Sequence, residues 1–535
     1  MKKTIKNNFV FALLGLFVLC FIAYSNTFHH GFLLDDYTYL IGEDNLLSVS
    51  TGSLFIKPFK EFFRPVGSSF LKAELMLFGE NPVGYHVVNL ILFLAVCYLF
   101  FLIVFRLTKN FELAFLTSCL YAVHPIHNFL VNYKSANMLS LYVLSMQIST
   151  IFFLKYLDNG RKKFYALSLI FYSLSLLSHE VSAMLPVYLF FILYFFHECP
   201  LAQKVKRCLP YLIILAVYLP IRMNLPEVRR IDNLFLLHIS FEEYLASLMN
   251  LTKWYLSKLM IPKDILFIWD EKIAGNVFQF WHFFVIVAVL SAFIYCLIKG
   301  KKDIRAFGLS IFILGFLPMF LGSFTYAPIL HNVLLEPHWF AFSSIGFFIF
   351  MASLFLIAGK RLNYRIVTAA ILIFLMMGAF WTRKGNTVWK DEQTITDYWL
   401  GLNKLNGTAW VAKAKIYIRD HDQGLNKRNY NDCNEVADLA GAYHFAWQSE
   451  AAIKYFQMAL EMNPECGNAY YGLGMLYKDN ENYPMAEEAL KTAVTINPQS
   501  YPAYEMLIEV YEKQGKNSEA EKIREMMGAK TGKGN

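Results

Sequence analysis

The stretch YHVVNLILFLAVCYLFFLIVF, residues 85–105, contains no Asp, Glu, Lys or Arg. A membrane-spanning helix needs about 20 mostly apolar residues, and this stretch meets that requirement. Comparable apolar runs recur up to about Trp381, after which the sequence becomes polar. Only 17% of the 535 residues are charged, compared with about 25% in ordinary soluble domains. The pattern predicts an all-α, polytopic membrane domain over residues 1–382.

Eleven such runs are predicted to cross the membrane, over about 9–25, 85–105, 112–130, 138–157, 164–179, 182–197, 209–224, 279–298, 306–323, 339–359 and 364–382. Run 9–25 follows basic residues and lacks a convincing small-residue cleavage site, so we interpret it as an uncleaved signal anchor. Residues 241–262 interleave apolar and charged side chains, which is typical of a helix lying in the membrane interface.

Basic residues in the short loops give the predicted orientation, because cytoplasmic loops are enriched in Lys and Arg. They fall in alternate loops, on the side of the N-terminal lysines: Arg106, Lys109, Arg161, Lys162, Lys163, Lys204, Lys206, Arg207, Lys301, Lys302, Arg305, Lys360, Arg361 and Arg365. The N-terminus is therefore predicted to be cytoplasmic, with loop 26–84 and the C-terminal domain outside. A bacterial inner membrane is the expected location, with the C-terminal domain in the periplasm. The basic residues of these short loops account for most of the net charge of +8. Membrane insertion explains that charge, so nucleic acid is not an expected partner.

A 34-residue period governs the C-terminal domain. AYYGLGMLY (469–477) recurs as AYEMLIEVY (503–511), and single residues keep the same spacing: Tyr443, Tyr477 and Tyr511; Leu439, Leu473 and Leu507; Ala452, Ala486 and Ala520. This period, with small residues at helix contacts, is typical of tetratricopeptide repeats. We predict an α-solenoid of three repeats over 435–535. A helical linker or degenerate repeat over 383–434 is predicted to precede it.

Solenoids of this kind present an extended face to partners. A protein is therefore expected to bind the repeats, with a scaffolding or dimer contact as the alternative. Cys433 and Cys466 flank the first repeat, and an oxidising outer compartment would permit a disulfide between them. The sequence leaves both the disulfide and two free thiols open, and it leaves the oligomeric state open as well.

Polar residues gather near the predicted outer ends of the spans. The set comprises Asp35, Asp36, Arg64, His86, Asn89, His124, His127, Asn128, His179, Glu180, His331, Glu336 and His338. Ionisable groups at membrane depth are costly to bury and mark functional sites by default. We therefore predict one outward-facing pocket that holds carboxylates, imidazoles and an arginine.

Several segments, in this order, resemble the membrane glycosyltransferases of the GT-C class. They are LLDDYTYL (33–40), FRPVGSSFLKAELMLFGENPVGYHVVNLILF (63–93), AVHPIHNFLVNYKSANMLSLYVL (122–144), LSHEVSAMLPVYLF (177–190) and LEPHWFAFSSIGF (335–347). More narrowly, they are similar to the transmembrane-and-tetratricopeptide-repeat O-mannosyltransferases and their bacterial relatives. The resemblance implies transfer of a monosaccharide from a polyprenyl-phosphate donor in the membrane to Ser or Thr of secreted or surface proteins.

The resemblance also implies that an acidic residue of the first outer loop, here Asp35 or Asp36, acts as general base or metal ligand. A Ser or Thr hydroxyl is a poor nucleophile without a base, and a phosphate leaving group favours a positive partner. Arg64 is the candidate cation, with Lys72 or Arg222 as substitutes. Donor phosphate or sugar binding is assigned to Arg64, His86, Glu180, Glu336 and His338.

Structural roles compete with these assignments: a turn or helix cap for the Asp pair, a snorkelling side chain for Arg64, and helix-start or interface contacts for the others. A divalent metal held by Asp35, Asp36, His124 and His127 is a further alternative, because HPIH (124–127) brings two imidazoles about one turn apart. Pro125 between them favours a helix start or kink instead.

The outer loop is predicted to roof the pocket with two short amphipathic helices, over FIKPFKEFF (55–63) and GSSFLKAELMLFG (67–79). The donor's lipid tail is expected to reach the site between spans, with segments 185–196 and 339–350 as walls. His179-Glu180 stands where the relatives often have Lys-Glu, and Glu336-Pro337-His338 where they often have Glu-Arg-Tyr, so the sugar stays open. A transferase that modifies a lipid or glycan, and a non-enzymatic membrane-anchored repeat scaffold, are the alternative functions.

Overall fold

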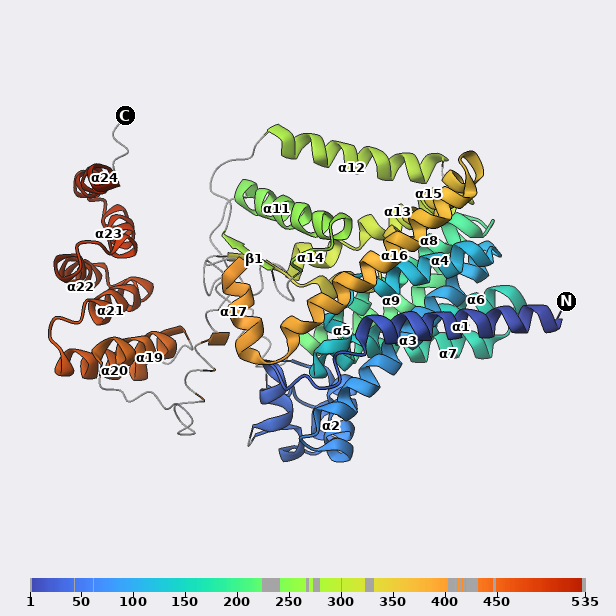
Figure 1. Ribbon diagram of the computed structural model, residues 1–535. Helices are drawn as coiled ribbons and strands as arrows, with labels where there is room; N and C mark the ends of the chain where they lie inside the picture. The colour runs from blue at the N-terminus through green and yellow to red at the C-terminus, as the bar shows by residue number, and fades with distance from the viewer. Residues whose placement is uncertain are drawn as a thin grey trace. The chain divides into compact units, whose positions relative to one another are not determined.

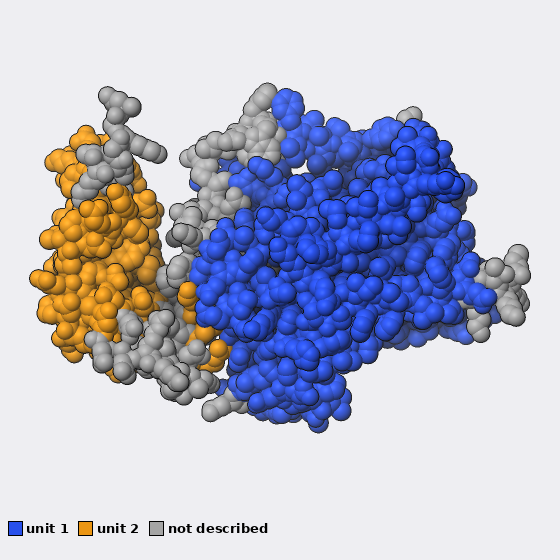
Figure 2. Space-filling model, viewed as in Figure 1, with its two compact units in different colours: residues 1–406 blue, residues 407–535 orange. Residues whose placement is uncertain are grey.

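The computed structural model describes residues 2–42, 44–60, 62–223, 241–265, 269–272, 280–299, 301–322, 332–402, 432–445 and 449–531, with isolated positions between 409 and 419. The chain forms two compact units, residues 1–406 and residues 407–535 (Figure 2). The described residues are almost all helical, as predicted. They depart from an all-α fold at one antiparallel ribbon, formed by β1 (Trp269–Lys272) and β2 (Asn332–Leu335).

Helices of the first unit pack side by side, with α1 against α3, α4 and α16, and α3 against α6 (Figure 1). In chain order they are α1 (Lys2–Tyr24), α2 (Pro65–Phe78), α3 (Pro82–Thr108), α4 (Phe111–Val123), α5 (Phe129–Asn132), α6 (Asn137–Asn159), α7 (Lys162–Leu176), α8 (Leu185–Phe196), α9 (Leu201–Met223), α11 (Phe241–Met260), α12 (Phe280–Lys299), α13 (Ile304–Leu314), α14 (Leu317–Gly322), α15 (Ile345–Arg361), α16 (Tyr364–Asn386) and α17 (Glu392–Leu402).

Asparagine side chains begin three of the long helices. Asn81, Asn110 and Asn363 each accept a hydrogen bond from a backbone N–H in the first turn of α3, α4 and α16. Such caps satisfy N–H groups that have no partner within the helix. The helices therefore begin where polar residues interrupt the apolar runs.

The predicted number of about eleven spans is too high for the described residues. Four helices there are long and apolar enough to cross a membrane, within Asn7–Tyr24, Pro82–Thr108, Asn137–Asn159 and Tyr364–Trp389. A fifth is reached if Phe111–Val123 and Pro125–Asn132, which meet at an angle of 62°, count as one bent span. Pro125 explains the bend, because proline cannot donate the backbone hydrogen bond that a continuous helix needs. Other apolar runs form shorter helices, such as the 12-residue α8.

Two glycines allow α13 and α15 to pack backbone against backbone. A Cβ atom on Gly308 would lie 2.7 Å from the carbonyl oxygen of Gly346, and one on Gly346 would lie 2.9 Å from the backbone nitrogen of Phe312. Small residues permit such close approaches between helices in membrane proteins. This contact fixes the start of α15, which follows the segment that carries Glu336 and His338.

Replacing Gly346 with Ala should therefore destabilise the first unit by about 1–3 kcal/mol, because the backbone atoms that meet the new methyl group cannot move aside as a side chain would. Thermal unfolding of the detergent-solubilised protein measures the effect. Gly359→Ala, on the same helix, is the matched control, since its nearest contact would be an ordinary 3.8 Å to Val367. Equal melting temperatures for the two variants would contradict the close contact.

The outer loop contains only one of its two predicted amphipathic helices. Residues 67–79 lie mostly within α2, as expected, but only Phe55 of the other predicted helix is helical, at the end of a 3-10 turn, and Phe59 and Phe62 form an isolated β-bridge instead. Pro58 accounts for the difference, because a proline disfavours helical geometry in the residue before it.

The chain after α16 returns to the outer loop. The backbone N–H of Gly31 donates to the Lys390 carbonyl oxygen at 2.8 Å, and that of Leu34 donates to Glu392 Oε1 at 2.7 Å. The first compact unit therefore includes α17, and the first part of the predicted linker 383–434 belongs to it. Most of residues 403–431 lie outside the described residues.

The second unit contains three helix pairs (Figure 1): α19 (Cys433–Phe445) with α20 (Ser449–Met462), α21 (Gly467–Asp479) with α22 (Tyr483–Ile496), and α23 (Tyr501–Lys513) with α24 (Asn517–Thr531). The periodic alanines Ala452, Ala486 and Ala520 are completely buried, as close helix packing requires. The predicted repeat architecture is therefore confirmed. Cys433 and Cys466 are free thiols in one buried cluster.

Candidate active site

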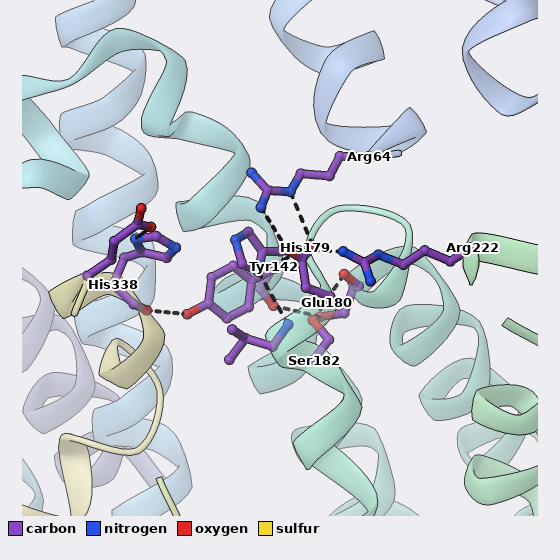
Figure 3. A network of polar contacts seen from close by, with 10 residues as sticks. Arg64, Tyr142, His179, Glu180, Ser182, Arg222 and His338 are labelled. Carbon is purple, nitrogen blue, oxygen red and sulfur yellow. Dashed lines mark hydrogen bonds and ion pairs between the residues drawn. The ribbon is translucent and has the colours of Figure 1, made fainter. Parts of the chain in front are cut away.

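An ion pair between two distant segments forms the centre of the candidate site (Figure 3). Arg64, just before α2, donates from Nη2 to Glu180 Oε1 at 2.8 Å and from Nε to Glu180 Oε2 at 3.2 Å. Arg222, in the last turn of α9, places its Nη2 3.8 Å from Glu180 Oε1. Two guanidinium groups thus converge on one carboxylate, so the three side chains together carry one excess positive charge.

Arg64 is held from two sides. Its guanidinium carbon lies 4.4 Å above the Phe62 ring, and its side chain is 13% exposed. A snorkelling arginine would extend its guanidinium into water, whereas this one is fixed against an aromatic face and a carboxylate. Bidentate geometry of this kind aligns the planar guanidinium for recognition of carboxylate or phosphate oxygens.

A buried polar layer adjoins this ion pair. The His179 and His338 rings meet edge to face at 5.1 Å, and Tyr142 donates from its hydroxyl to the His338 carbonyl oxygen at 2.7 Å (Figure 3). Glu336, directly after β2, lies 3.1 Å from His338 Nδ1. The structure therefore brings together the predicted residues Arg64, Glu180, Glu336 and His338.

The adjacent acids Asp35 and Asp36 have opposite environments. Asp36 is completely buried and accepts hydrogen bonds from the backbone N–H groups of Leu33 and Ser135 at 3.0 and 2.8 Å. Asp35 is exposed, and its backbone N–H donates to the Tyr133 hydroxyl at 2.9 Å. Asp36 thus anchors the outer loop, while the Asp35 carboxylate remains accessible and lies close enough to raise the pKa of Glu336.

Lys134 is the buried cation beside Asp36. Its ammonium group donates to the Gly31 carbonyl oxygen and lies 5.2 Å from the centre of the Phe32 ring. Burial lowers the pKa of Lys134 to about 8, and Asp36 opposes that shift. Burial raises the pKa of Asp36, and Lys134 in turn opposes that change. The two groups stabilise each other's charge under the outer loop.

Three predicted histidines are occupied by structural contacts. His86 has its ring nitrogens 3.2 Å from the carbonyl oxygens of Val131 and His30. His124 caps the 3-10 turn that follows it, and His127 stacks on Tyr121 at 3.8 Å. Both ring nitrogens of His86 are thus engaged by backbone carbonyl oxygens, and its assignment to donor binding remains a prediction.

The predicted metal alternative does not assemble. Within the part of the chain that the structure describes, no group of three or more His, Cys, Asp or Glu side chains is placed to hold a metal ion. The centres of the His124 and His127 rings are 6.4 Å apart, with Pro125 turning the backbone between them. The two carboxylate oxygens of Asp36 accept hydrogen bonds from two backbone N–H groups. The set Asp35, Asp36, His124 and His127 is therefore corrected.

Other predicted residues have mixed outcomes. Asn89 donates to the Tyr133 carbonyl oxygen at 2.9 Å, which is a structural contact. Lys72 donates to the Val49 carbonyl oxygen and does not join the arginine pair, so Arg222 is the second cation. His331 lies outside the described residues. Tyr142 and Glu74 were not among the predicted site residues, although both lie in segments that resemble the GT-C enzymes. Glu74 is buried on α2 with a hydrogen bond from Asn137.

Besides Asp36, two further carboxyl groups have raised pKa values: Glu74, which is buried, and Glu336, which is partly buried. Burial raises the pKa of Glu336 to about 8; the Arg64 charge opposes this shift, while the Asp35 and Glu180 charges add to it. Burial alone raises the pKa of Glu74 to about 8. At neutral pH the protonated form of each acid therefore predominates, and Glu336 has a proton to donate beside His338.

These pKa values predict how stability depends on pH. Between about 4.5 and 8 the folded protein keeps protons that the unfolded chain has lost, so the free energy of unfolding falls as pH rises through this window. We expect Glu336→Gln to remove on the order of 3 kcal/mol of that decrease, and Glu74→Gln with Glu336→Gln to remove more. Unfolding measured at the two ends of the window tests this. An unchanged pH dependence in the double variant would contradict it.

An apolar pocket lies within the first unit. It is lined by residues from α3, α6, α8, α13, α15 and the segment before α15, among them Phe100, Thr150, Tyr188, Ile192, Phe342 and Ile349. The predicted lipid walls, segments 185–196 and 339–350, both contribute to this lining. The cavity is small, about 30 Å³, so it marks an apolar wall between helices and has no room for a lipid chain as it stands.

Comparison with known families identifies the repeats alone. The family model of the tetratricopeptide repeat matches residues 448–507, which agrees with the helix pairs of the second unit. Such repeats generally mediate contacts between proteins, so a protein partner is consistent with the match. No curated protein matches the chain.

Proposed function

We propose that the first unit is a GT-C-type glycosyltransferase that moves a monosaccharide from a polyprenyl-phosphate donor to Ser or Thr of secreted or surface proteins. The observation that carries the proposal is the convergence of Arg64 and Arg222 on Glu180 beside Glu336 and Asp35. Paired guanidinium groups suit a phosphate leaving group, and an accessible carboxylate suits the removal of a hydroxyl proton.

The reaction has a simple electron balance. The acceptor oxygen attacks the anomeric carbon, the bond between that carbon and the phosphate oxygen breaks, and its electron pair leaves with the phosphate. Asp35 takes the acceptor proton, while Arg64 and Arg222 stabilise the phosphate charge. The partly buried acid Glu336 is placed to donate a hydrogen bond to a sugar or phosphate oxygen.

The membrane anchors the donor in this proposal. Its isoprenoid tail runs between segments 185–196 and 339–350, whose apolar side chains line the small cavity between the helices. The site faces the periplasm of a bacterial inner membrane, and the repeats recruit the acceptor protein. The resemblance of segments 33–40, 63–93, 122–144, 177–190 and 335–347 to GT-C enzymes supports the same chemistry.

Mass spectrometry of Ser- and Thr-linked glycopeptides from envelope and secreted proteins tests the proposal. Cells with the wild-type chain should carry a defined sugar mass that cells with Asp35→Asn lack. Asp44→Asn is the control, because Asp44 is also exposed in the outer loop. If glycopeptides are unchanged in folded Asp35→Asn and Asp36→Asn variants alike, protein glycosylation is excluded. Lipid-linked glycans then become the substrates to assay, with the repeat scaffold as the remaining alternative.

A further inference from the structure

A residue with unusual backbone geometry directly precedes the candidate base. Leu34 has a φ of 47°, in the left-handed region, where a side chain crowds the neighbouring backbone. Residues other than glycine keep such a conformation only where the surrounding structure imposes it, and these positions cluster at functional sites. Asp35 is the next residue in the chain, so the direction of its carboxylate depends on what holds Leu34.

Two hydrogen bonds hold the backbone at this point. The N–H of Leu34 donates to Glu392 Oε1 at 2.7 Å, and the N–H of Asp35 donates to the Tyr133 hydroxyl at 2.9 Å. The Tyr133 ring in turn lies beside the Trp389 ring, with 6.1 Å between the ring centres. The segment after α16 therefore reaches both N–H groups, directly through Glu392 and indirectly through Trp389 and Tyr133.

Glu392 can hold the outer loop because another residue caps its own helix. It is the first residue of α17 and is only 8% exposed. Asp391 Oδ1 accepts hydrogen bonds from the backbone N–H and the hydroxyl of Thr394, at 2.8 and 2.6 Å, and so caps the start of α17. The Glu392 carboxyl group points instead to the loop. Polar groups removed from water are costly to leave unpaired, so this contact favours the observed position of Leu34.

We propose that Glu392 is a positioning residue for the candidate base. Its carboxyl group keeps Leu34 left-handed and thereby fixes the direction of the Asp35 carboxylate. A general base acts only within hydrogen-bond reach of the proton that it removes, and a displacement of about 1 Å can lower a rate by about 100-fold. The role of Asp35 as base belongs to the proposed function, on which this inference rests, whereas the hold of Glu392 on the loop is independent of it.

Hydrogen–deuterium exchange of the detergent-solubilised, full-length protein measures that hold. Glu392→Ala should speed exchange in the peptide 31–37 by about ten-fold, because the loop loses a restraint. Glu392→Gln keeps an acceptor oxygen and should stay near the wild-type rate. Asp391→Ala is the matched control, since it removes the cap of the same helix and spares the contact with Leu34. Unchanged exchange in Glu392→Ala, or an equal increase in Asp391→Ala, would overturn the proposal.

Transfer kinetics of the same variants, at equal folded concentration, measure the consequence for the base. Glu392→Ala should lower kcat by about 10–100-fold with little change in KM for the polyprenyl-phosphate sugar, because the base moves while the donor site stays. Glu392→Gln should restore most of the kcat, and Asp391→Ala should keep it. A wild-type kcat in Glu392→Ala, with Asp35→Asn inactive in the same assay, would overturn the proposal.

A glycine at position 34 tests the left-handed backbone itself. Glycine adopts a positive φ without a steric penalty, so adding Leu34→Gly to Glu392→Ala should regain about five-fold in kcat. Adding Leu34→Ala, which keeps a Cβ atom, should regain little, and equal rates of the two double variants would contradict the role of Leu34. If the wild-type chain transfers no sugar, or Asp35→Asn is fully active, the proposed function fails instead, and the exchange rates still decide whether Glu392 holds the loop.

Discussion

Replacing Asp35 with Asn should lower the rate of sugar transfer by about 10²–10⁴-fold and leave the protein folded. The amide keeps the shape of the side chain but cannot accept the proton of the acceptor hydroxyl. Asp35 is exposed and its hydrogen bond to Tyr133 uses the backbone N–H, so little packing depends on the carboxylate. Transfer from a synthetic polyprenyl-phosphate sugar to a Ser/Thr peptide by the purified protein measures the effect.

Asp36→Asn should behave differently. Asp36 accepts two backbone hydrogen bonds in a buried position beside Lys134, and removing its charge leaves that ammonium group without its buried counterion. We expect a loss of stability of about 1–3 kcal/mol, with activity falling only as far as folded protein is lost. A catalytic loss in Asp36→Asn at full stability, with Asp35→Asn active, would reverse the assignment of the base.

The fold was predictable where a periodic pattern repeats over many residues. The 34-residue period identified the helix pairs of the second unit, and the apolar run 85–105 became α3. Composition alone could not show that several apolar runs form helices shorter than a bilayer. The β1–β2 ribbon was also unpredictable, because each strand is four residues long and finds its partner far away in the sequence.

The candidate site was predictable as a set of residue types but not as a set of contacts. Ionisable groups are costly to bury at membrane depth, and this cost indicated that Glu180 and Glu336 belong to a functional site. The structure brings both carboxyl groups near Arg64. Asp35 is exposed and Asp36 is buried because it is the Asp36 carboxylate that faces backbone N–H groups. Two identical neighbouring residues in a sequence do not show which of them will have such partners. The contacts of His86 could not be predicted for a related reason: its ring lies against backbone carbonyl groups, which leave no trace in the sequence.

Replacing Arg64 with Ala should lower kcat/KM for the donor by about 10²–10³-fold, because the leaving phosphate loses its fixed guanidinium partner. Arg64→Lys should restore only part of the activity, since an ammonium group cannot reproduce the two parallel hydrogen bonds that reach Glu180. Arg222, at 3.8 Å from Glu180, makes the weaker contact, so Arg222→Ala should have the smaller effect.

A control variant at a second arginine–carboxylate pair, measured in the same transfer assay, separates a loss of catalysis from a loss of protein stability. Arg106 pairs with Asp158 at the ends of α3 and α6, away from the candidate site, and Arg106→Ala removes an arginine–carboxylate contact there without touching the donor. Its kcat/KM should stay near the wild-type value at equal folded concentration. If Arg64→Ala and Arg106→Ala lose activity equally, Arg64 acts through stability alone. A loss confined to Arg64→Ala, and larger for the phosphate-linked donor than for the acceptor peptide, identifies Arg64 as the phosphate-binding residue.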